Sequence, residues 1–143
     1  MGNVGAIMRT CVAAGAKLHL IEPLGFHWDS RVIERTSVHL IQQLDYQIYV
    51  DFAQFRSVNN HPELIAVECS AATWYSQINF RNYQRVFLLF GQESIGLPQE
   101  LLREITVVVR IPMRPQARSL NLATSVAITL FEVCRQFCHP GLT

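Results

Sequence analysis

A glycine-rich loop at residues 90–98 has the side chains and the backbone freedom that a ligand site needs. Gly91 and Gly96 allow the backbone to turn tightly and to approach a ligand closely. Glu93 lies between them as a lone carboxylate. The glycine spacing is that of a phosphate-binding P-loop, but Leu97 and Pro98 replace its lysine and its serine or threonine. The loop therefore indicates a ligand site of another kind.

A second loop, at residues 111–122, brings polar side chains to the predicted start of the last helix. Arg114 and Arg118 have planar guanidinium groups, which suit bidentate contacts with phosphate. The alternative is that both arginines are ordinary loop residues exposed to solvent, with no role in binding. Ser119 and Asn121 add a hydroxyl and an amide, and Ser119 is the residue that we expect to cap the helix. The sequence contains no G-x-G-x-x-G fingerprint and indicates no Ser-His-Asp triad.

Both loops follow runs of residues that are typical of buried parallel strands. Residues 86–90 (VFLLF) and 105–111 (ITVVVRI) are apolar on both faces. Ligands of open α/β sheets bind beyond the carboxyl ends of the strands, so we expect the two loops to lie together. Apolar runs alternate with helical patterns along the chain, which predicts an α/β fold. The other expected strands are 17–21, 46–50 and 64–69, and the expected helices are 3–14, 31–43, a short helix capped by Asp51, another that starts at Pro98, and 119–138.

The length and composition of the chain favour one domain. Of its 143 residues, 50% are hydrophobic and only 16% are charged. So few charges indicate either a compact, well-filled core or an apolar surface that a second subunit covers. The formal net charge is +1, so no strong overall field attracts nucleic acid. RNA would have to be bound by a local group of arginines.

The four cysteines form no C-x-x-C pair, and we expect no metal site. The spacing of Cys134 and Cys138 places both on one face of the predicted last helix. We expect all four to be small, buried, reduced residues of a cytoplasmic protein. A signal peptide is not recognisable, and no apolar run reaches the roughly 18 residues of a membrane span.

Three blocks of the sequence resemble the three motifs of the SpoU family, within the SPOUT class of RNA methyltransferases. Residues 3–9 (NVGAIMR) resemble the first motif, Asn-x-Gly-x-x-x-Arg. Residues 90–98 (FGQESIGLP) resemble the second, Phe-Gly-x-Glu-x-x-Gly-Leu-Pro. Residues 111–113 (IPM), with 119–122 (SLNL) and Glu132, resemble the third. The blocks occur in the order of the family, and the last one leads into a helix at the corresponding place.

The resemblance implies an α/β fold with a SPOUT-type parallel sheet flanked by helices, in a single domain over residues 1–143. In the family the C-terminal part forms a deep trefoil knot, a feature that is otherwise almost absent from proteins. The knotted loops bind S-adenosylmethionine and form much of a homodimer interface. By position, the family's cofactor contacts, which are largely backbone groups, match Val67, Gly91, Ile111 and Ser119, with Leu120 beside them.

The resemblance also implies the residues of catalysis. In the family, the arginine of the first motif is assigned a part in deprotonating the ribose 2′-hydroxyl. The corresponding residue here is Arg9. A guanidinium is almost never deprotonated in a protein, so we expect Arg9 to act with an RNA phosphate and to stabilise developing negative charge. The other expected site residues are Asn3 and Asn121, which orient the site; Glu93, which holds Arg9 or a loop backbone; and Arg114 and Arg118, which contact phosphate.

Simpler roles remain open for three of these residues. Asn3 can be only a helix cap, Glu93 can be purely structural, and Arg9 can be a surface residue of its helix. The functional alternatives are a SpoU-type enzyme for another tRNA or rRNA site, and a truncated, non-catalytic RNA- or cofactor-binding protein.

Two further stretches resemble the branch of the family that methylates the wobble nucleotide of tRNA. They are residues 18–26 with Trp28 and Asp29, and the ending with Arg135-Gln136 and Pro140-Gly141. The implied partner is the anticodon loop of tRNA, whose single-stranded nucleotides expose bases and 2′-hydroxyl groups.

Family members have a strand before the first motif, whereas this sequence begins two residues before Asn3. We therefore expect the first strand to be missing, with unpaired backbone and an open apolar groove as the result. The explanations are a start at an internal methionine, which is favoured, a strand from another chain, or a degenerate, inactive member.

Overall fold

The computed structural model of the protein describes residues 2–24 and 42–143. They belong to two compact units, Met1–His61 and Pro62–Thr143. In the described ranges no helix is long and apolar enough to cross a membrane. The helix expected at residues 31–43 falls almost wholly outside these ranges, as do Trp28 and Asp29.

The first unit combines helices with a two-stranded parallel sheet. Helix α1 ends where Gly15 adopts a φ of 65°, and its last carbonyls accept hydrogen bonds from the N–H groups of Gly15 and Ala16, a Schellman motif. Asp51 caps α3 by accepting a hydrogen bond from the Gln54 N–H (2.7 Å), as predicted. The elements are α1 (Gly2–Ala14), β1 (Leu18–Ile21), β2 (Tyr46–Tyr49) and α3 (Phe52–Val58).

The small core of this unit lies under α1, where Met8, Cys11 and Leu44 are buried together. A second contact joins β1 to β2 through their side chains: His19 Nδ1 lies 2.8 Å from the hydroxyl of the buried Tyr49. The strands pair in register from Leu18 with Tyr46 to Ile21 with Tyr49. The first unit is thus held by apolar packing around α1 and a polar aromatic contact on the sheet.

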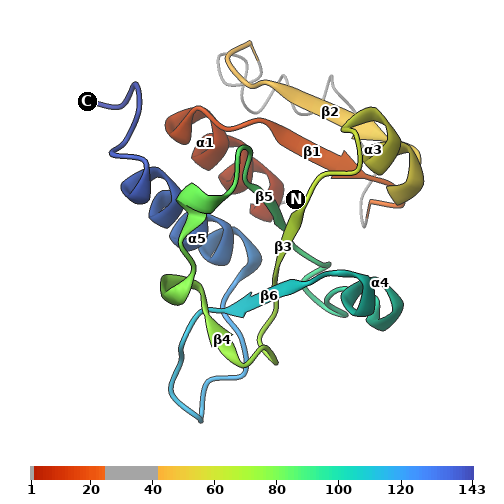
Figure 1. Cartoon of the computed structure of the whole chain (residues 1–143), viewed down its shortest axis with the longest axis vertical. Coiled ribbons are helices and arrows are strands. Elements are labelled where there is room, and N and C mark those ends of the chain that lie inside the picture. Colours follow the sequence, from red (N-terminus) through yellow and green to blue (C-terminus); the bar gives the residue numbers. More distant parts are fainter. Residues whose placement is uncertain (1, 25–41) are drawn as a thin grey trace. The chain divides into compact units, whose positions relative to one another are not determined.

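The second unit contains a four-stranded, fully parallel sheet in the order β4-β6-β3-β5 (Figure 1). The central strands consist largely of β-branched and other aliphatic residues, which fit a sheet that is covered on both faces. The elements are β3 (Leu64–Val67), β4 (Thr73–Trp74), two 3₁₀ turns (Tyr75–Gln77 and Phe80–Asn82), β5 (Phe87–Leu89), α4 (Gln99–Glu104), β6 (Val107–Arg110) and α5 (Leu122–Gln136).

The core of the second unit forms where α5 meets the sheet. Ile65 of β3, Phe80 and Val109 of β6 are fully buried, and Val133 of α5 packs against them. The predicted α/β class, with a parallel sheet and flanking helices, is therefore confirmed. Strand β4 and the two 3₁₀ turns were not expected from the sequence.

Three local predictions are wrong. Ser119 does not cap the last helix: Asn121 does, because its Oδ1 accepts hydrogen bonds from the N–H groups of Ala123 (3.0 Å) and Thr124 (3.3 Å). The cysteines are not all buried, since Cys69 and Cys138 are exposed while Cys11 and Cys134 are buried. Cys138 also lies beyond the end of α5, with a φ of 60°, so it does not share a helix face with Cys134.

Candidate active site

The carboxyl ends of three strands meet at one edge of the second unit's sheet. Ala66 pairs with Leu89, and Val67 pairs with Val109, so β3, β5 and β6 end at nearly the same level. Val67 is the last residue of β3, Gly91 follows β5 by two residues, and Ile111 directly follows β6. Three of the residues expected to contact a cofactor therefore lie at this shared edge.

The glycine-rich loop folds back on itself directly after β5. The Gly96 N–H donates to the carbonyl of Gln92 (2.8 Å), which closes a tight turn. A Cβ atom on Gly91 would lie 2.1 Å from the carbonyl carbon of Gly96 and 2.3 Å from the nitrogen of Leu97. Gly96 has a φ of 69°, which favours glycine. Both positions thus require glycine, and at Gly91 the backbone that comes close is that of the loop itself.

A side-chain hydrogen bond joins the two loops. Asn121 Nδ2 donates to Glu93 Oε1 over 3.0 Å, while the Oδ1 atom of the same amide caps α5. The expected proximity of the glycine-rich loop to the loop before the last helix is therefore present. Glu93 thus binds the neighbouring loop through the side chain of Asn121.

The loop at residues 111–120 presents its arginines to solvent. Arg114 and Arg118 are exposed, and a turn closes between them because the Ala117 N–H donates to the Arg114 carbonyl (2.9 Å). Ser119 is exposed and Leu120 is half-buried, both directly before the cap Asn121. These two residues lie next to the hydrogen bond between Asn121 and Glu93, which we call the joint between the loops. The side chains of both arginines are open to solvent.

Asn3 and Arg9 belong to α1 of the first unit. The helix begins at Gly2, which places the half-buried Asn3 in the first turn rather than at the capping position. Arg9 is exposed, although Met8 and Cys11 on the same helix are buried.

Two residues at the sheet edge were not predicted. Glu68, directly after β3, accepts a hydrogen bond from the Leu97 N–H (2.8 Å). Arg110 ends β6, and its buried Nε atom has no hydrogen-bond partner within the described residues. A signal for each was present in the sequence, because a charged residue at the carboxyl end of an apolar strand falls where ligands bind. Across the described ranges no three His, Cys, Asp or Glu residues form a group that could hold a metal ion.

Glu132, the last residue of the third block, makes its side-chain hydrogen bonds within α5 and not at the sheet edge. Its carboxylate accepts two hydrogen bonds from Arg135 (2.7 and 2.8 Å) and one from Gln136 Nε2 (2.8 Å). These contacts, led by that of Arg135, lower the pKa of Glu132 although partial burial opposes them.

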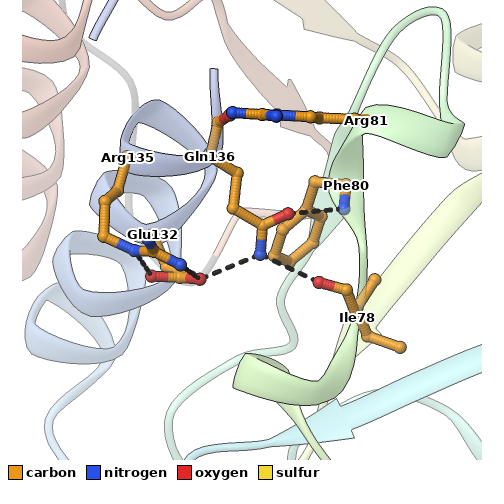
Figure 2. Close-up of polar contacts among 6 residues, drawn as sticks. All are labelled: Ile78, Phe80, Arg81, Glu132, Arg135 and Gln136. Atoms are coloured by element: carbon orange, nitrogen blue, oxygen red, sulfur yellow. Dashed lines mark hydrogen bonds and ion pairs between the residues drawn. The ribbon is translucent and has the colours of Figure 1, made fainter. Parts of the chain in front are cut away.

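Figure 2 shows the Gln136 amide between this carboxylate and the segment that includes the second 3₁₀ turn. Gln136 Oε1 accepts from the Phe80 N–H (2.8 Å), and Nε2 donates to the Ile78 carbonyl (2.9 Å). Arg81 Nε donates to the backbone carbonyl of Gln136. The network ties the end of α5 to the segment that contributes Phe80 to the core.

The sequence profile of the SpoU rRNA methylase family matches residues 1–131. Among the curated relatives, the tRNA (cytidine(34)-2′-O)-methyltransferase of Aeromonas hydrophila is 36% identical over 141 residues. That match covers 97% of this chain and 89% of the relative.

Solved structures agree with the sequence matches. One that addresses the 2-OH methylation of C/U34 on tRNA has a TM-score of 0.84 and 34% identity, over 95% of this chain and 83% of that chain. The AdoMet-bound rRNA methyltransferase of Sinorhizobium meliloti has a TM-score of 0.79 and 32% identity. That likeness covers 94% of this chain and 51% of the other.

Proposed function

The chain belongs to the SpoU rRNA methylase family, and from that premise we propose that it transfers a methyl group from S-adenosylmethionine to a ribose 2′-hydroxyl of RNA, at the wobble nucleotide, position 34, of tRNA. The observation that carries the proposal is the joint between the two motif loops, Asn121 to Glu93, at the edge where β3, β5 and β6 end. The choice of tRNA rests on relatives that match nearly the whole chain.

The residues at the sheet edge fit S-adenosylmethionine. Backbone groups that follow Val67, Gly91 and Ile111 can bind the adenine, and the half-buried Leu120 gives an apolar wall. The carboxylate of Glu93 favours a cationic ligand at the same edge. Bound S-adenosylmethionine would supply a methyl carbon on a positively charged sulfonium, which is already a good leaving group.

The protein's own tasks are then alignment and the handling of one proton. Arg9 would hold the 2′-hydroxyl together with an RNA phosphate and stabilise the negative charge that develops on the oxygen. Asn3 would orient the same site, and Asn121 with Glu93 would keep the two loops in place. Arg114 and Arg118, which are exposed, would bind phosphates of the anticodon loop.

We extend the proposal to the organisation of the molecule. The family profile covers residues 1–131 and therefore spans both units, which supports one methyltransferase domain over residues 1–143. A homodimer through the predicted knot region is supported by Phe131 and Phe137, two large apolar side chains at α5 that are 39% and 40% exposed.

The test is methyl transfer by the purified protein to unmodified tRNA, followed by mass mapping of 2′-O-methyl nucleotides. We expect one methyl group on the ribose of nucleotide 34 and none when S-adenosylmethionine is omitted. Transfer to another tRNA position or to rRNA alone would refute the choice of nucleotide. Absence of both transfer and cofactor binding would refute the enzymatic proposal and favour the degenerate alternative.

A further inference from the structure

Glu68 connects the end of β3 to the glycine-rich loop. Its backbone N–H donates to the carbonyl of Val109 (2.8 Å), which fixes the residue against β6. Its side chain extends to the loop, where Oε1 accepts the Leu97 N–H (2.8 Å). Leu97 is only 7% exposed, so little water reaches this residue, and a lost acceptor would leave its N–H poorly satisfied.

The same carboxylate occupies the space beside Gly96. A Cβ atom on Gly96 would lie 2.9 Å from Glu68 Oε1 and 3.5 Å from Oε2. Glu68 therefore fits against the bare backbone of Gly96 and binds the next residue, Leu97. The loop is fastened at two points: at its end by Glu68, and in its middle by the bond between Glu93 and Asn121.

We infer that Glu68 is a positioning residue of the cofactor site, which fixes the glycine-rich loop by accepting the Leu97 N–H. This inference rests on the proposed function for its cofactor, but its structural part does not. The essential feature is the acceptor oxygen, because the contact that holds the loop is a hydrogen bond. Glutamine keeps an oxygen at the same distance along the side chain, so Glu68→Gln should preserve the contact with the loop. Glu68→Ala should abolish it.

The structural part is tested by hydrogen exchange of the Leu97 amide in cofactor-free protein. We expect exchange at least tenfold faster in Glu68→Ala and near the wild-type rate in Glu68→Gln. Glu63→Ala is the matched control, since it removes the same charge from an exposed position just before β3. Unchanged protection of Leu97 in Glu68→Ala would overturn the inference. Thermal unfolding of each variant shows whether it is folded, and Glu68→Gln keeps the test valid if Glu68→Ala is not.

The functional part is tested by calorimetry and kinetics with S-adenosylmethionine. Loss of the hydrogen bond should weaken cofactor binding about tenfold in Glu68→Ala and raise KM for the cofactor more than it lowers kcat. Glu68→Gln should bind within about threefold of wild type. An equal loss in both variants would overturn the inference, because charge rather than the acceptor would then matter.

The two proposals fail in different ways. If wild-type protein binds no S-adenosylmethionine, the proposed function is refuted while the exchange of the Leu97 amide still reports on Glu68. If wild type binds the cofactor and Glu68→Ala binds it equally well, only the positioning role is refuted.

Discussion

A single amide, that of Asn121, holds two structures together. Its oxygen caps α5, and its nitrogen binds Glu93 in the glycine-rich loop. Substitution of Asn121 would therefore change both the stability of a helix and the position of a loop. A loss of activity at this residue cannot by itself be assigned to catalysis, which is why a residue outside the joint gives the clearer test of mechanism.

Arg9 is that residue. Arg9→Ala should lower kcat by about 100-fold, because it removes a charge that stabilises the transition state, while cofactor affinity stays within about twofold. The measurement is methyl transfer to tRNA together with calorimetry of cofactor binding. Arg103→Ala, an exposed arginine of α4, serves as control and should keep full activity. Undiminished transfer by Arg9→Ala would refute the proposed role.

Some contacts of individual residues could be predicted from the sequence, and others could not. The need for glycine at positions 91 and 96 was predictable, because a tight loop after a buried strand leaves few other choices. The contact of Glu68 with Leu97 was not, since it joins residues 29 positions apart through tertiary structure alone. Ser119 and Asn121 are both good capping residues, and only the geometry of the loop decides between them.

At the scale of elements, the cap of α5 makes a quantitative prediction. Asn121→Ala should lower the free energy of unfolding by about 1 kcal/mol, because it leaves the Ala123 and Thr124 N–H groups without their acceptor. Ser119→Ala should change it by less than about 0.5 kcal/mol. Urea unfolding of the two variants measures the difference. A larger loss of free energy of unfolding in Ser119→Ala than in Asn121→Ala would instead identify Ser119 as the cap.

The end of α5 should respond to acid. The pKa of Glu132 lies below its ordinary value of 4.5, chiefly because Arg135 donates to the carboxylate. A carboxyl group with a lowered pKa stabilises the fold above its unfolded-state pKa, and this contribution disappears as pH falls through the folded-state value. Glu132→Gln should therefore be about 1 kcal/mol less stable than wild type at neutral pH. The gap should close below about pH 4.5.

Chemical denaturation of both proteins over this pH range provides the measurement. A difference that stays constant down to about pH 3 would contradict the assigned role, because a carboxyl group with a lowered folded-state pKa loses stabilisation once the pH falls below its unfolded-state pKa.

Long apolar elements were the most predictable. Strands β3, β5 and β6 and helices α1 and α5 were expected from their patterns, with differences of a few residues at the ends. Strand β4 has only two residues, both exposed, so no alternation marks it in the sequence. The Phe80 N–H of the turn at Phe80–Asn82 donates a hydrogen bond to Gln136 Oε1, 56 positions away, and no local pattern encodes such a contact.

At the scale of the whole molecule, a homodimer is the central prediction. Light scattering with size-exclusion chromatography should give twice the mass of the 16.3 kDa chain. Phe131→Asp should weaken the dimer at least tenfold, because burial of a phenylalanine contributes about 2 kcal/mol. Val58→Asp, at a position of α3 that is 53% exposed, is the matched control and should leave the dimer intact. If Phe131→Asp leaves the dimer as intact as Val58→Asp does, the interface lies elsewhere.

The distribution of the cysteines has a practical consequence. Burial raises the pKa of the Cys11 thiol to about 11, and Cys134 is also buried, so neither should react readily with maleimide near neutral pH. The exposed thiol of Cys69 directly follows Glu68 at the sheet edge, whereas that of Cys138 lies beyond α5. A dye on Cys69 would serve as a fluorescent reporter of ligand arrival, and saturation with S-adenosylmethionine should slow the labelling of Cys69 relative to Cys138. The unmodified chain thus includes both a probe and its internal reference.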